Sequence, residues 1–76
     1  MSETIDLDVR GLEPPEPLER VLVALDTLPP QASLRIKINC QPRPLYRVLE
    51  RIGYVYDERP GSDSLLEITI RMRDGS

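Results

Sequence analysis

The side chains in this chain that are best suited to chemistry are one thiol and two arginine guanidinium groups. Arg10 ends an alternating apolar segment, Cys40 follows a second such segment, and Arg43 lies three residues further on. Each segment precedes a proline-containing sequence typical of a helix's first turn, where backbone N–H groups carry partial positive charge. A thiol beside an arginine at a helix start favours the reactive thiolate, and two arginines there favour anion binding.

The same residues also have purely structural interpretations, which the sequence leaves open. Arg10 would then pair only with a neighbouring acid on the sheet. Cys40 would be a small filler at a strand end, the commoner fate of a lone cysteine. Val23 and Ala24 lie off the main apolar stripe of their helix and are candidates for a partner surface, although exposed small apolar residues are common.

The spacing of apolar residues predicts six elements in the order β-α-β-α-β-β. Strands are predicted at 4–10, 33–39, 54–59 and 65–72, and helices that open at 13–17 and 42–44 and end near 28 and 52. Gly53 is expected to be the left-handed cap of the second helix. All strands except the third alternate apolar and polar residues, so both helices are expected on one face of the sheet.

The apolar faces of these elements are expected to extend to their ends. Ile5 on the first strand, Met72 on the last and Ile52 on the second helix are all predicted to face the core. On the polar face, Asp6 and Asp8 are expected near Arg35 and Lys37 if the first two strands are parallel neighbours.

Parallel first and second strands bring both strand-to-helix loops to the same end of the sheet. Ligands of open α/β sheets usually bind at this end, outside the carboxyl ends of the strands. The candidate binding residues that the two loops supply are Arg10, Glu13, Pro14, Cys40 and Arg43.

Length and composition restrict the class of protein. The 76 residues allow a single domain over 1–76, with an ordered core of about 4–73 and residues 74–76 expected to fray. The chain is 39% hydrophobic and has no Phe or Trp, so a shallow surface site is expected rather than a deep pocket. No catalytic constellation is visible, so an enzyme is not expected.

Charge and cysteine content narrow the choice of ligands. The net charge is −3 and the basic residues are scattered, which disfavours nucleic acid. The chain has no histidine and one cysteine, so neither a metal site, a cofactor nor an internal disulfide is predicted. No run of 18 apolar residues is present, and the N-terminus does not resemble a signal peptide. We therefore expect a cytoplasmic protein without a membrane segment.

Two motifs carry a resemblance to a known family. In the segment Leu7–Pro17, Gly11-Leu12 and Pro15-Glu16-Pro17 match the opening of TusA-like (SirA-like) sulfur carriers, whose pattern is Gly-Leu-x-Cys-Pro-x-Pro. The chain is most similar to a sister group, domain of unknown function 2249, which shares this opening and a later Pro-Arg-Pro-Leu-Tyr, here residues 42–46. The resemblance implies an α+β two-layer sandwich whose mixed four-stranded sheet has the order 1-2-4-3.

One departure from the carrier pattern affects the expected function. The carriers hold sulfur as a persulfide on the Cys-Pro-x-Pro cysteine, and this chain has Pro14 at that position. We therefore expect a non-catalytic binding or accessory module that holds a protein partner or a small anion in a sulfur- or redox-related pathway. The alternative is a sulfur or redox relay that uses Cys40 instead. RNA binding by analogy of fold is disfavoured by the acidic charge, and the expected state is a monomer or weak dimer.

Overall fold

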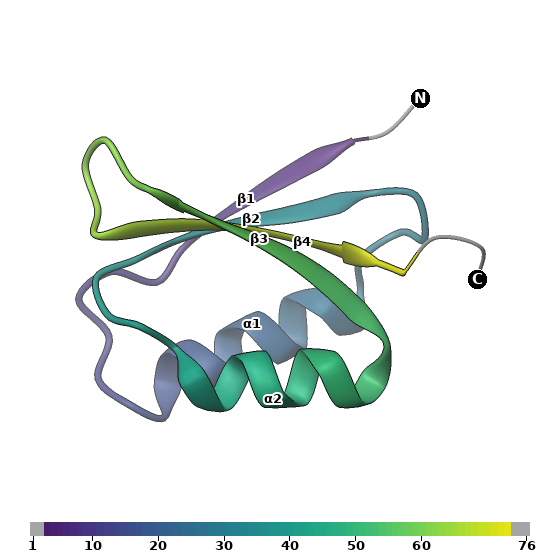
Figure 1. The fold of residues 1–76 in the computed structure, drawn as a ribbon, viewed down its shortest axis with the longest axis horizontal. Coiled ribbons are helices and arrows are strands. Elements are labelled where there is room, and N and C mark those ends of the chain that lie inside the picture. The colour runs from purple at the N-terminus through teal and green to yellow at the C-terminus, as the bar shows by residue number, and fades with distance from the viewer. Residues whose placement is uncertain (1–2, 74–76) are drawn as a thin grey trace.

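The structure, a computed structural model, describes residues 3–73 as a four-stranded sheet with two helices beneath one face (Figure 1). The elements in chain order are β1 (Thr4–Asp8), α1 (Glu16–Asp26), β2 (Ser33–Ile38), α2 (Arg43–Ile52), β3 (Tyr54–Pro60) and β4 (Leu66–Met72). The sheet order is β1-β2-β4-β3. The expected fold class, element order and strand order are thus confirmed. The expected fraying of 74–76 lies outside the described residues.

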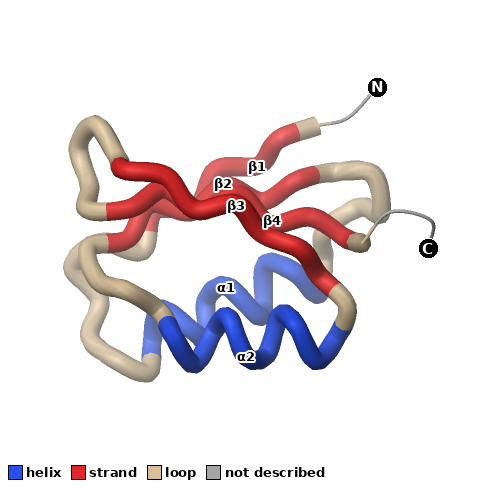
Figure 2. The backbone as a smooth tube through the Cα atoms, viewed as in Figure 1, coloured by secondary structure: helices blue, strands red, loops and turns tan. Residues whose placement is uncertain are grey.

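The first two strands are parallel neighbours, and the other two pairings are antiparallel. Asp6 lies opposite Arg35 and Asp8 opposite Lys37, as predicted. The adjacency continues past β1, because the Val9 N–H donates to the Lys37 carbonyl at 3.0 Å. The connection from β1 to β2 and that from β2 to β3 each contain a helix that returns beneath the sheet. The helices α1 and α2 therefore run in the same direction (Figure 2).

Prolines and a glycine set the limits of the helices. Both helices have proline in the first turn, where its missing N–H has no helical partner. Gly53 ends α2 in the left-handed conformation with φ of 93°, and its N–H donates to the Leu49 carbonyl at 3.1 Å. The predicted left-handed cap is therefore confirmed. Glycine suits this position because a residue with a Cβ is disfavoured at such a φ.

The core lies between the sheet and the helices and is wholly aliphatic. Its fully buried side chains alternate along β2 and β4 and recur along the helices. They are Val9, Val21, Leu25, Leu34, Ile36, Ile38, Leu45, Leu49, Ile68 and Ile70. Within residues 3–73 no polar or charged side chain is buried, so the polar face of the sheet remains open to solvent.

Three residues predicted to face the core are exposed instead. Ile5 and Met72 are each 37% exposed, and Ile52 is 52% exposed. Ile5 and Met72 lie near the strand ends away from the loops that open the helices, and Ile52 is the last residue of α2. The alternation of apolar residues and their helical spacing therefore overstated how far the buried core extends toward the strand ends and the end of α2.

Candidate functional site

Three loops meet at one end of the molecule, at the left of Figure 1. They are the β1–α1 loop (residues 9–15), the β2–α2 loop (39–42) and the β3–β4 loop (61–65). We call this surface the rim. The parallel pairing of β1 and β2 places the first two loops at this end, as predicted, and the antiparallel β3–β4 pair adds the third.

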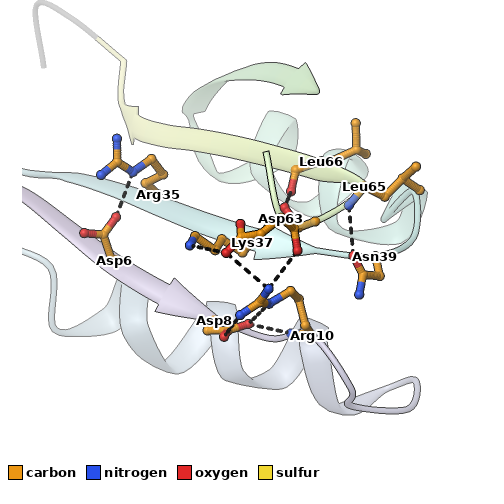
Figure 3. A network of polar contacts seen from close by, with 10 residues as sticks. Asp6, Asp8, Arg10, Arg35, Lys37, Asn39, Asp63, Leu65 and Leu66 are labelled. Carbon is orange, nitrogen blue, oxygen red and sulfur yellow. Dashed lines mark hydrogen bonds and ion pairs between the residues drawn. The ribbon is translucent and has the colours of Figure 1, made fainter. Parts of the chain in front are cut away.

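Arg10 connects the first and third of these loops (Figure 3). Its Nε and Nη2 donate to the two carboxylate oxygens of Asp8 at 2.9 and 2.7 Å, which is the strong bidentate geometry. Its Nη1 donates to the Asp63 carbonyl at 2.7 Å and lies 3.4 Å from the Asp63 carboxylate. The pairing with a neighbouring acid that the sequence left open is therefore present.

Two further contacts attach β2 and its loop to the same β3–β4 loop. Lys37 Nζ donates to the Asp63 carboxylate at 3.2 Å. The Leu65 N–H donates to Asn39 Oδ1 at 2.8 Å (Figure 3). The three loops are consequently joined by side-chain hydrogen bonds into one surface before any partner is present.

The electrostatics of the rim keep these groups charged. The hydrogen bonds from Arg10 hold the pKa of Asp8 well below its usual range. The hydrogen bond from Lys37 lowers the pKa of Asp63, and the hydrogen bonds that Arg10 donates to Asp8 raise the pKa of Arg10. All of these side chains are at least partly exposed, so solvent screens their contribution to stability.

The helix starts at the rim offer few donors to a small anion. In α1 the Glu16 N–H already donates to the Glu13 carbonyl at 2.9 Å, and Pro17 has no N–H. In α2 the Arg43 N–H donates to the Gln41 carbonyl at 3.1 Å, and Pro44 again has no N–H. The expected array of free backbone N–H groups is therefore largely absent, since the prolines that start these helices also remove donors.

The remaining predicted site residues divide between the rim and the helix layer. Glu13, Pro14 and Cys40 are exposed on the rim, and Cys40 is a free thiol. Arg43 instead lines a shallow groove on α2. The Arg10 guanidinium, by contrast, is already bonded to Asp8 and Asp63.

A pair of tyrosines forms a second polar cluster that sequence analysis missed. The rings of Tyr46 and Tyr56 stack at 4.3 Å between centroids, with an interplanar angle of 3°. Tyr46 donates to Glu58, and Tyr56 donates to Glu50 at 3.2 Å. Burial, followed by these carboxylates, raises the pKa of both phenols. The cluster fixes α2 to β3, and the only signal for it was Tyr46 within Pro-Arg-Pro-Leu-Tyr.

Two specialised features are absent from residues 3–73. No three His, Cys, Asp or Glu side chains there are grouped so that they could hold a metal ion. None of the helices in this part of the chain is long and apolar enough to cross a membrane.

Comparison with known proteins assigns the chain to a family. It is similar to the crystal structure of a SirA-like protein from Desulfitobacterium hafniense, with a TM-score of 0.76 and 21% identity over 97% of this chain and 100% of that one. At that identity the match establishes a SirA-like fold. No curated protein sequence matches the chain. A model of the uncharacterised conserved protein family DUF2249 matches residues 6–72, and because this covers most of the sequence, the chain belongs to that family.

Proposed function

We propose that this domain is a non-catalytic accessory module that binds a protein partner through the rim, in a sulfur- or redox-related pathway of the cytoplasm. The observation that carries the proposal is the joining of three loops by Arg10 and Asn39. A surface whose loops are already fixed loses less conformational entropy on binding, which favours recognition of a macromolecule. The SirA-like fold supports the choice of pathway.

A protein partner is favoured over a small anion because of where the donors lie. Arg10 already has two carboxylates as partners, and two of the N–H groups at the helix starts are used by the chain itself. An isolated anion would therefore meet few free donors. A protein surface can instead use the whole exposed strip, which contains Glu13, Pro14 and Cys40.

The rim proposal predicts a loss of capture when Arg10 is removed. Cross-linking followed by mass spectrometry, on the protein in extracts of its native cells, would compare wild type with Arg10→Ala. We expect the variant to lose about tenfold or more of a specific cross-linked partner, because the β1–α1 and β3–β4 loops are no longer joined by the Arg10 side chain. The matched control is Arg35→Ala, which removes an ion-paired arginine from the open face of the sheet. Equal capture by wild type and the rim variant would exclude the rim.

The alternative function is a sulfur relay on Cys40, favoured by the exposure of its free thiol. In that reaction the Cys40 thiolate attacks the outer sulfur of a donor enzyme's cysteine persulfide, so Cys40 gains the sulfur and the donor cysteine leaves as a thiolate. Incubation with a cysteine desulfurase and free cysteine is then expected to add the mass of one sulfur atom to wild type and not to Cys40→Ser. An unchanged mass of the wild type, under conditions that load a Cys-Pro-x-Pro carrier, would reject the relay.

A further inference from the structure

The outer face of α2 carries a stripe of three arginines. Arg43, Arg47 and Arg51 are spaced four residues apart, so they lie on one side of the helix. All three are exposed, and none forms an ion pair with another residue of the described part of the chain. Together with Pro44 and Val48 they line a shallow groove of about 430 Å³. Three adjacent positive charges are notable in a chain whose net charge is −3.

The outer face of α1 has the opposite character. Glu19 and Asp26 are exposed on it, and neither forms an ion pair within residues 3–73. Val23 lies between them and is 66% exposed, more than any other large apolar side chain in the described range. The helix layer therefore presents an acidic half on α1 and a basic half on α2, each with apolar side chains beside the charges, since Pro44 and Val48 line the α2 groove.

The arrangement of the helices makes this surface complementary to itself. Both helices cover the same face of the sheet and run in the same direction (Figure 1). A two-fold axis that lies in the interface and runs parallel to the helices therefore places α1 of one copy on α2 of the other in the same direction, and the reverse contact follows by symmetry.

The charges match in register in that arrangement. At 1.5 Å per residue, Glu19 and Asp26 lie about 10.5 Å apart along α1, and Arg43 and Arg51 about 12 Å apart along α2. Because this axis leaves positions along the helices unchanged, Glu19 near the start of α1 meets the second copy's Arg43, and Asp26 at the end of α1 meets its Arg51. Val23 then lies between the two ion pairs, opposite the middle of α2.

We propose that the helix layer is a self-association surface, through which two copies of this chain form a two-fold dimer. Its occupant is a second copy because the chain's own α1 supplies the acidic and apolar groups that the α2 stripe lacks. Two helices of about 16 Å give an interface at the small end of the known range, so the dimer is weak and reversible. Because its ion pairs are exposed, salt weakens it.

Charge reversal with rescue tests the proposal. Sedimentation equilibrium would measure the dimer dissociation constant of wild type, Arg51→Glu and Asp26→Arg at low and high salt. Each single variant places two repulsive pairs in its own dimer, so dimerisation is expected to weaken about tenfold or more. When the two variants are mixed in equal amounts, a dimer of one copy of each contains one native ion pair and one ion pair with its charges exchanged. We therefore expect the mixture to associate about as strongly as wild type.

Three control measurements distinguish loss of this interface from a general effect of charge, from unfolding and from loss of the rim. Arg71→Glu makes the same charge change on the opposite face of the sheet and is expected to dimerise as wild type does. Circular dichroism would establish that both interface variants remain folded. Arg51 lies in the last turn of α2, away from the rim, so partner capture by Arg51→Glu is expected to be retained whether or not the dimer forms.

Three results would overturn the dimer. They are a wild-type chain that stays monomeric at all accessible concentrations, single variants with unchanged dissociation constants, and a mixture that fails to recover association. A monomeric wild type that binds a polyglutamate peptide, with Arg51→Glu binding it about tenfold more weakly, would assign the stripe to an acidic partner protein and likewise exclude the second copy.

Discussion

Leu49→Ala is expected to leave much of the chain unfolded at physiological temperature. Leu49 is completely buried in the middle of the aliphatic core. Truncating a buried leucine costs about 2–5 kcal/mol, because apolar contacts are lost and a cavity remains. A domain of 76 residues has a total unfolding free energy of about 4–11 kcal/mol. The substitution therefore removes a large fraction of the stability of the domain.

Urea denaturation followed by circular dichroism would measure this effect. The matched control is Leu65→Ala, since the Leu65 side chain is 58% exposed and its truncation is expected to change the unfolding free energy by less than about 0.5 kcal/mol. Similar midpoints for the two variants would show that α2 contributes little to the core, in contradiction to the complete burial of Leu49.

Acidification is expected to destabilise the sheet through the carboxylates on its open face. The hydrogen bond from Arg35 lowers the pKa of Asp6, and that from Arg10 lowers the pKa of Asp8. The pKa of Asp63 is lowered in the same sense by Lys37. A depressed folded pKa means that the folded state binds protons less readily than the unfolded state. The stabilisation is therefore complete above the ordinary aspartate pKa of about 4, and it is lost as the pH falls through the lower folded values.

Arg10→Met tests the origin of this acid sensitivity. Thermal melts between pH 7 and pH 2 are expected to show a lower Tm for the variant at pH 7 and a shallower decline of Tm with acidification. The reason is that Asp8 loses its bidentate partner and its pKa returns toward the ordinary value. The control Arg71→Met removes an arginine that forms no ion pair with a carboxylate of residues 3–73 and lies away from the helix layer, so its decline should follow that of wild type. Parallel curves for Arg10→Met and wild type would contradict the pairing in Figure 3.

The sheet could be predicted from sequence because its buried strands alternate so regularly. Leu34, Ile36 and Ile38 are all buried, whereas Arg35 is exposed between them. The length of the covered region could not be predicted in this way. Ile5 continues the same alternation and is nevertheless 37% exposed, because burial at a strand end depends on which residues pack over it in space rather than on its own sequence neighbours.

The candidate site was only partly accessible to the same reasoning. Parallel strands necessarily bring the loops after β1 and β2 to one end, so the place of Cys40 on the rim followed from topology. The contact from Arg10 to Asp63 spans 53 residues, and it depends on which strand lies beside β2. The tyrosine stack was equally hidden, because an α2 residue and a β3 residue share no periodic pattern.

The order of the strands also has a consequence for how the protein behaves at high concentration. β1 and β3 are the outer strands, and their unpaired backbone groups could template cross-β growth by other chains. Both outer strands carry residues that oppose such growth. On β1 these are the alternating carboxylates, and on β3 they are Asp57-Glu58-Arg59-Pro60. Charged side chains repel an incoming strand, and proline cannot donate a backbone hydrogen bond to it. Resistance to fibril formation is therefore built into both margins of the sheet.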